Sequence, residues 1–312
     1  MLETKKGNSA EINLLLTVLL QESGLEAYPV LISTKGHETI NRDFPDISSF
    51  NQIISIVIID GNEYLLDATS KLRPYDLLAI KDLNRDGLLL DKKKVRWVDI
   101  KPGKSNSTII YSNLDLQKDK TDQLQYQVNI KYTGYEAYFS RNNYITLGEE
   151  KYIQKHMKML DASPVKVEFK NTENIDEPFQ IDFTLPANSE IIGDILYIQP
   201  FIKKHFDENP FKVKERQFPI DFLYPNQEVF LFKMTIPENY QIDDLPENLS
   251  IALPDKKGYY VYSVTQMDNL IQISSRLVLT EYFFWQDYYP HLKEMFDQVI
   301  IKQNEQIVLK KK

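Results

Sequence analysis

Apolar residues near the start of the chain recur at the spacing of an α-helix. They lie three and four positions apart and form one stripe: Ile12, Leu15, Leu16, Leu19 and Leu20. This spacing predicts a helix over residues 9–23. Asn8 is a suitable N-cap, and Glu11 three residues later completes a capping-box pattern. Gly24 is placed to end the helix in the left-handed conformation.

The residues that follow this helix predict strands. Residues 27–34 (AYPVLIST) and 51–60 (NQIISIVIID) are rich in residues that favour β-structure, and a polar loop separates them. The pair Gly61-Asn62 is a hairpin turn pattern, so residues 63–70 (EYLLDATS) are expected to return beside the second strand. The first hundred residues therefore predict a helix, a strand, a loop and a β-hairpin.

The pattern changes after residues 98–107 (VDIKPGKSNS), a stretch typical of a linker. Two stretches then predict paired strands and one predicts helix in two pieces: 107–116, 123–134 and 135–160. From 165 to 280 the chain alternates in short strands separated by Pro and Asn, which favours an antiparallel sandwich. A helix over 289–305 and a strand, QIVLKK, follow.

Together these elements predict an α+β chain with two domains, as its 312 residues allow. The first domain is expected over residues 1–100. The second, over residues 101–312, is expected to be larger and mostly β, with a helical insertion near 135–160 and a C-terminal helix. Hydrophobic residues make up 42% of the chain, which is enough for packed cores.

The composition argues against several kinds of site. The chain has no cysteine, which excludes disulfides, thiolate metal sites and a Cys nucleophile. Its four histidines lack zinc-site spacing, and no phosphate-binding glycine motif occurs, so we expect no metal and no cofactor. The net charge is −8 without a basic block, which argues against nucleic acid. No apolar run approaches the ~20 residues of a membrane span, and no signal peptide is recognisable.

Two segments carry a family resemblance: KKGNSAEINLLLTVLLQESGLEAYPVLIST (5–34) and FPDISSFNQIISIVIIDGNEYLLDATS (44–70). They resemble the transglutaminase-like superfamily, which has a papain-like fold. More narrowly, they are similar to bacterial multidomain proteins, common in Bacteroidetes, that carry such a core between β-rich domains. The resemblance covers roughly residues 5–100. It continues more weakly downstream, where it implies a β-sandwich-type domain ending in a helix and a strand.

In active members of this superfamily a Cys begins the helix, a His begins a strand and an Asp lies in LLDAT. The helix N-terminus favours a thiolate, the His acts as base and the Asp orients the His. The resemblance carries these three positions onto Ser9, Gln52 and Asp67. A serine hydroxyl is a weak nucleophile without an adjacent base, and a glutamine amide has no basicity near neutral pH. The resemblance therefore implies a degenerate, non-catalytic core.

We expect Ser9 to be a hydrogen bonder at the helix start, and Gln52 and Asp67 to form a polar pair across the hairpin. With Asn8 and Asn51, these residues form the expected binding site. An inactive cleft can still hold an extended peptide beside its sheet. An extended peptide or another envelope protein is therefore the expected partner. Since a whole core of this kind has further helices before the nucleophile, a partial one is expected to expose apolar surface or to cover it with residues from elsewhere.

The alternative is a hydrolase, either a protease or amidase or an acyl-transferring enzyme. In it Ser9 would use a histidine recruited from elsewhere, and His37 is the nearest candidate. Relatives usually carry export signals, so the resemblance implies the periplasm or the cell surface. The aromatic segment 280–290 (TEYFFWQDYYP) leaves two interpretations open: burial of the last helix, or stacking on sugars or peptides. Residues 82–87 (DLNRDG) are interpreted as a turn.

Overall fold

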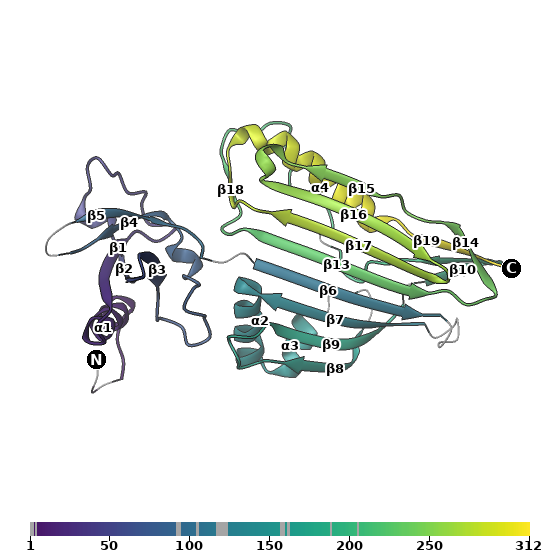
Figure 1. Cartoon of the computed structure of the whole chain (residues 1–312), viewed down its shortest axis with the longest axis horizontal. Helices are drawn as coiled ribbons and strands as arrows, with labels where there is room; N and C mark the ends of the chain where they lie inside the picture. The colour runs from purple at the N-terminus through teal and green to yellow at the C-terminus, as the bar shows by residue number, and fades with distance from the viewer. Residues whose placement is uncertain are drawn as a thin grey trace. The chain divides into compact units, whose positions relative to one another are not determined.

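The structure is a computed structural model that divides into two compact units, Met1–Lys104 and Ser105–Lys312 (Figure 1). It describes residues 3, 5–91, 95–103, 106–116, 124–156, 160, 163–187, 189–204 and 206–312. Parts of four sequence-based interpretations lie outside the described residues: 104–105 of the predicted linker, 123 of the predicted strand 123–134, 157–159 of the predicted helical stretch, and His205.

The first unit is a helix packed against a five-stranded sheet. Its elements are α1 (Ser9–Glu22), β1 (Glu26–Ile32), β2 (Gln52–Ile59), β3 (Asn62–Leu66), β4 (Arg85–Leu89) and β5 (Arg96–Ile100), with short 3-10 turns at Ile47–Ser49 and Ile80–Asp82. The strands follow the order β3-β2-β1-β4-β5, and every neighbouring pair is antiparallel. Helix α1 contacts β1 and β2.

Helix α1 confirms the predicted helix and its end. Gly24 has φ of +82°. Its N–H donates to the carbonyl of Gln21 at 2.9 Å, and the N–H of Leu25 donates to that of Leu20 at 3.0 Å. These two bonds satisfy carbonyls that would have no partner at the end of the helix. They require a residue in the left-handed conformation, and Gly24 is that residue.

The face that α1 turns to the sheet is polar, which the stripe of leucines did not indicate. The buried residues of α1 are Asn13 and Thr17. The Thr17 hydroxyl lies 2.7 Å from that of Ser55 on β2. On the outside, 40–55% of each of three large apolar residues is exposed: Leu14, Val18 and Leu19.

The hairpin between β2 and β3 turns one residue earlier than the sequence suggested. Ile59 pairs with Asn62, so the two-residue turn is Asp60-Gly61 rather than Gly61-Asn62. Both turn residues have positive φ, 51° and 78°, as this tight hairpin connection requires. Strands β4 and β5 were not predicted. Their sequences, RDGLL and RWVDI, are short, and each contains an Arg and an Asp, so neither forms an extended apolar run.

The second unit begins at β6 and is mostly β. Its strands are β6 (Asn106–Asp115), β7 (Gln125–Thr133), β8 (Val165–Lys170), β9 (Phe179–Pro186), β10 (Ser189–Ile192), β11 (Ile195–Ile198), β12 (Ile220–Asp221), β13 (Asn226–Thr235), β14 (Tyr240–Asp244), β15 (Leu249–Ala252), β16 (Gly258–Met267), β17 (Leu270–Leu279), β18 (Phe283–Phe284) and β19 (Ile307–Lys311). Its helices are α2 (Gly134–Leu147), α3 (Glu149–His156) and α4 (Tyr289–Asn304), and they confirm the helices predicted near 135–160 and over 289–305.

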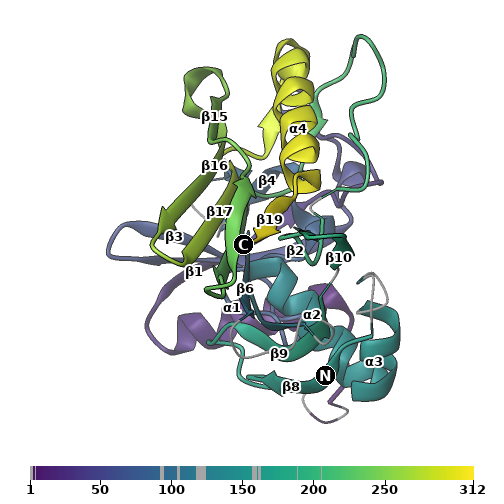
Figure 2. The same ribbon diagram turned by 90° about the vertical axis from the view of Figure 1, so that its right-hand side faces the viewer.

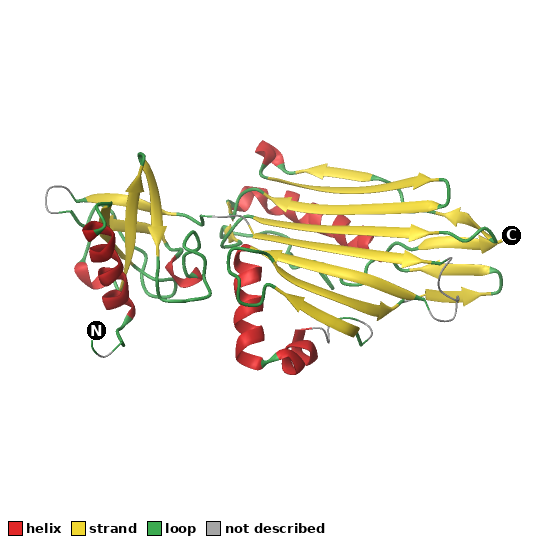
Figure 3. Ribbon diagram, turned by 60° about the horizontal axis from the view of Figure 1, so that its bottom comes forward, coloured by secondary structure: helices red, strands yellow, loops and turns green. Residues whose placement is uncertain are grey.

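One large sheet organises this unit, in the order β15-β16-β17-β13-β6-β7-β9-β8. All its neighbouring pairs are antiparallel except β6 and β13, which run parallel. A smaller sheet, β10-β11-β19-β14, and helix α4 lie on one side of β16 and β17 (Figure 2). Helices α2 and α3 lie near the β8–β9 end of the large sheet (Figure 3). The α+β class with antiparallel sheets and a C-terminal helix is confirmed.

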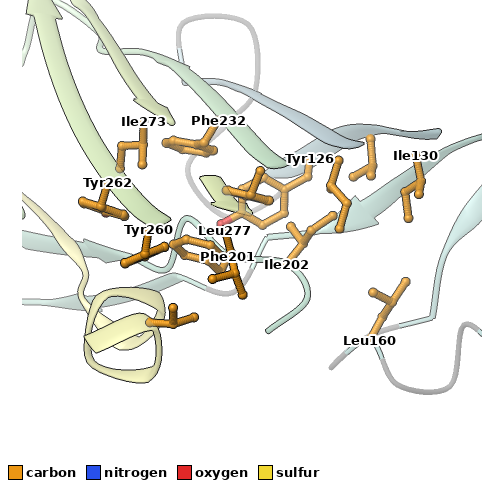
Figure 4. Packing of buried hydrophobic residues seen from close by; sticks show 14 of the residues in the cluster. Tyr126, Ile130, Leu160, Phe201, Ile202, Phe232, Tyr260, Tyr262, Ile273 and Leu277 are labelled. Atoms are coloured by element: carbon orange, nitrogen blue, oxygen red, sulfur yellow. The ribbon is translucent and has the colours of Figure 1, made fainter. Parts of the chain in front are cut away.

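The core of the second unit follows strand periodicity. Every second residue of β9 is buried: Phe179, Ile181, Phe183 and Leu185. Helix α4 buries residues three and four apart in the same core: Leu292, Met295, Phe296 and Val299. Phe201 stacks on Phe230 with ring centroids 4.4 Å apart, and the buried Tyr126 hydroxyl donates to the Gln199 carbonyl at 2.6 Å. Figure 4 shows Tyr126 and Phe201 among the packed side chains of this core. The core is thus rich in aromatic side chains.

Gly258 lies where β16 and β17 approach each other closely. A Cβ placed there would lie 2.8 Å from the carbonyl oxygen of Val278, and backbone cannot move aside as a side chain can. We expect Gly258→Ala to lower the free energy of unfolding by about 1–3 kcal/mol, measured by denaturant titration. Gly193→Ala is not a suitable control because its φ is +63°. Ser250→Ala on β15, which keeps the backbone unchanged, should stay within about 0.5 kcal/mol of the parent.

Candidate functional site

Ser9 is the first residue of α1, and the cap before it has the predicted form. The Asn8 side-chain oxygen accepts from the Glu11 N–H at 2.9 Å, and the Asn8 N–H donates to the Glu11 carboxylate at 2.8 Å. This reciprocal pair is the predicted capping box. It fixes the start of the helix, and so holds the Ser9 hydroxyl at a helix N-terminus.

The Ser9 hydroxyl meets Gln52 at the start of β2. Ser9 Oγ donates to Gln52 Oε1 at 2.7 Å, and the same oxygen accepts from the Ile53 N–H at 3.1 Å. Gln52 is 4% exposed, and its Nε2 has no hydrogen-bond partner among the described residues. The structure therefore brings the nucleophile and base positions of the resemblance together. The group that receives the Ser9 proton is an amide oxygen, which cannot remove it at neutral pH.

Asp67 lies just after β3 and is held from several sides. Its carboxylate accepts from Asn13 Nδ2 at 3.0 Å, from the Thr69 N–H at 3.1 Å and from the Thr69 hydroxyl at 2.9 Å. The buried Arg73 guanidinium forms an ion pair with it. Burial alone would raise the pKa of Asp67, but the bond from Asn13, the charge of Arg73 and the bonds from Thr69 together lower it.

Asp67 does not form the expected polar pair with Gln52, because Asn13 takes that place. Asn13 Nδ2 donates both to Asp67 and to the Ile53 carbonyl, the latter at 2.9 Å, and Asn13 Oδ1 accepts from the Ala68 N–H at 2.8 Å. One buried amide thus links α1, β2 and the end of β3. Sequence reasoning missed Asn13, although a polar residue one helical turn after Ser9 in an apolar run was a visible sign.

Asp82 completes this cluster and had no sign in the sequence. It ends the turn Ile80–Asp82 and is fully buried. Burial, and then the negative charge of Asp67, raise the pKa of Asp82 to about 7, and neither oxygen of the Asp82 carboxyl has a hydrogen-bond partner among the described residues. Below about pH 7, Asp82 is therefore mostly protonated in the folded chain. Asp67, Asp82 and Arg73 form a buried cluster of two carboxyl groups and one guanidinium.

The remaining predicted residues lie in the loop between β1 and β2 or at its ends. Asn51 clamps this loop: its Oδ1 accepts from the Thr34 N–H and its Nδ2 donates to the Thr34 hydroxyl, both at 2.9 Å. His37 Nε2 lies 3.2 Å from the Ser48 carbonyl oxygen. The imidazole contact that the structure records for His37 is therefore with the backbone of its own loop.

Other candidate chemistry contributes little to the site. Among the residues that the structure describes, no three His, Asp or Glu side chains gather as metal ligands would. Within the same residues no helix has the length and apolar character to span a membrane. In the aromatic segment 280–290, Phe284 and Tyr289 are buried in the core with α4, whereas Trp285 is 53% exposed. The segment thus mainly anchors the last helix.

Comparison with known proteins relates both units to other proteins. Residues 194–309 match a family model, DUF3858, described as a domain of unknown function with a solved structure. The fold is similar to a crystal structure of a "putative protease" from Parabacteroides distasonis, with a TM-score of 0.52 and 11% identity, covering 99% of this chain and 45% of that one. This chain thus spans less than half of that protein, and the likeness shows the fold alone. The search of curated proteins found no match.

Proposed function

We propose that this chain is a transglutaminase-like protein that has lost its catalytic residues and serves as a non-catalytic binding or scaffolding module. One observation carries the proposal: Ser9 Oγ donates to the Gln52 amide oxygen at 2.7 Å. An active centre of this kind needs a base at that place, and an amide is not one. The hydroxyl is therefore a structural group that joins α1 to β2.

The state of Asp67 supports the same conclusion. In a working triad the carboxylate orients an imidazole. Here Asn13, Thr69 and Arg73 occupy the carboxylate oxygens. This carboxylate stabilises the fold around the helix instead of preparing a base.

The family resemblance supplies the setting of the proposal. The partner we propose is an extended peptide or another protein of the bacterial envelope, and the location is the periplasm or the cell surface. The fold likeness to a larger protein, of which this chain covers 45%, is compatible with a module that acts beside further domains.

A reactive-serine probe tests the loss of activity. We expect no labelling of the full chain by a fluorophosphonate and no turnover of peptide or amide substrates, with Ser9→Ala indistinguishable from the parent. The matched control is Ser48→Ala, a serine of the loop near His37. Labelling that Ser9→Ala abolishes and Ser48→Ala retains would overturn the proposal. If His37→Ala also abolished it, the hydrolase alternative would hold.

A further inference from the structure

A cleft of about 690 Å³ lies between the two edge strands of the five-stranded sheet. Its walls include residues 63–65 of β3 and 96–99 of β5. Side chains alternate between the two faces of a strand, so a wall made of consecutive residues is the edge of the strand and not one face. The cleft therefore opens onto the backbone edges of β3 and β5. Its volume is within the range of ligand sites, roughly 300–1,000 Å³.

The backbone groups at both strand edges can form hydrogen bonds with another chain. Strands β3 and β5 are the outermost strands of their sheet, and each has one strand partner among the residues that the structure describes. An edge strand presents a row of N–H and C=O groups that can pair with another chain. The Glu63 and Arg96 side chains form an ion pair from one edge to the other. The two edges are thus close enough for long side chains to meet, yet the strands themselves are not paired.

Aromatic side chains line the same cleft. Tyr64 and Trp97 come from the two strands, and Tyr75 comes from the segment before β4. Tyr75 is 68% exposed and Tyr64 is 39% exposed. The Arg42 guanidinium carbon lies over the Trp97 ring, 5.7 Å from the centroid of that ring. Large rigid rings around a backbone edge provide contact area at a low cost in conformational entropy.

The charges at the cleft balance: Glu63, Asp76 and Asp99 are negative, and Arg96, Lys101 and the adjacent Arg42 are positive. Besides the Glu63–Arg96 pair, Asp99 lies 2.6 Å from Arg42 and 3.4 Å from Lys101. Paired charges leave little net field to attract a phosphate, a polyanion or a strongly basic segment. The partner that fits unpaired strand edges, aromatic walls and balanced charge is an uncharged polypeptide in extended conformation.

We infer that this cleft binds an extended, uncharged peptide segment of another protein. The segment adds as a strand to the free edge of β5 and seats an apolar side chain against Tyr75 and Trp97. The cleft residues are different from Ser9 and Gln52, so this inference holds whether or not Ser9 is inert. It goes beyond the proposed function by naming a binding surface, and the two can fail separately.

A peptide selection on the full chain tests the inference. The probe is a library of capped, uncharged peptides of about seven residues, a common strand length. Binding of selected peptides is followed by fluorescence in a Trp285→Phe background, where Trp97 is the remaining tryptophan of two. We expect enrichment of alternating β-branched and aromatic residues, and a change in Trp97 emission on binding.

Two changes separate strand addition from unspecific adhesion. Tyr75→Ser should weaken binding at least about tenfold, as loss of an aromatic anchor does. N-methylation of alternate peptide nitrogens on the strand-pairing side should weaken it by a similar factor, because it removes the backbone donors. The matched control is Tyr111→Ser, since Tyr111 is 39% exposed on the second unit and should leave affinity unchanged.

Three results would overturn the inference. The first is a library that yields no peptide enriched on the parent over Tyr75→Ser. The second is selected peptides that bind equally after N-methylation of either set of nitrogens. The third is a Trp97 emission change caused by oligosaccharides while peptides leave it unaltered, which would make the rings a sugar platform. Because Tyr75 is largely exposed, its replacement leaves the packing of the sheet intact, so lost binding is not lost folding.

Discussion

Replacement of Arg73 by leucine is expected to lower the stability of the first unit by about 3–5 kcal/mol. Arg73 and Asp67 form an ion pair whose side chains are 4% and 0% exposed. Removing one partner of such a pair leaves the other charge buried without compensation. Here the remaining carboxylate would also face Asp82, so the variant would have two buried acids and no guanidinium.

The measurement is denaturant unfolding of the full chain, followed by Trp97 emission in the Trp285→Phe background. Arg42→Leu is the matched control. Like Arg73, Arg42 forms ion pairs with carboxylates, those of Asp86 and Asp99, but 43% of its side chain is exposed. An exposed pair contributes about 1 kcal/mol or less. If both variants lost the same small amount, the buried pair would not be the stabilising contact described above.

Asp82→Asn should stabilise the first unit above pH 7 and have little effect near pH 4. The folded state raises the pKa of Asp82 from 3.8 to about 7, so between these values the folded chain binds a proton that the unfolded chain has released. Stability from this group is fully present below pH 3.8 and is lost as pH rises through about 7. The loss is on the order of 4 kcal/mol for a shift of about three units. Asparagine keeps a donor toward Asp67 and does not ionise.

Chemical denaturation at about pH 4.5 and about pH 8 checks the sign, because the window lies between the two pKa values. The parent should lose stability on going to the higher pH, relative to Asp82→Asn at each value. The lowered pKa of Asp67 acts at more acidic pH, where stability falls as Asp67 takes up a proton, so it does not interfere. If the free energies of unfolding of the parent and of Asp82→Asn differed by the same amount at both pH values, Asp82 would have the same charge at both.

Local patterns predicted those parts of the fold that local interactions determine. Asn8, Glu11 and Gly24 give the limits of α1 because caps depend on neighbours in sequence. Strands β4 and β5 were not predicted, because pairing with neighbouring strands makes them strands and their own residues show no clear pattern. The parallel pairing of β6 and β13 joins residues about 120 positions apart, and no period in either strand indicates it.

The candidate site divides in the same way. A family pattern led to Ser9, Gln52 and Asp67, and the structure brings the first two into contact. Asp82 was read as part of a turn, since only the folded chain brings its carboxyl against Asp67. The edge cleft was missed because an open strand edge is a property of sheet order, which single-sequence patterns do not contain.

The place of β19 in the smaller sheet has a consequence for synthesis on the ribosome. Ile307–Lys311 lies between β11 and β14 and bonds to both, so it is an inner strand although it comes last in sequence order. Translation releases the chain from its N-terminal end, so β11 and β14 emerge long before the strand that joins them. Until then each of these two strands has an unpaired edge to which other nascent chains can bind. A holding chaperone that binds unpaired strand edges would find its target in that interval.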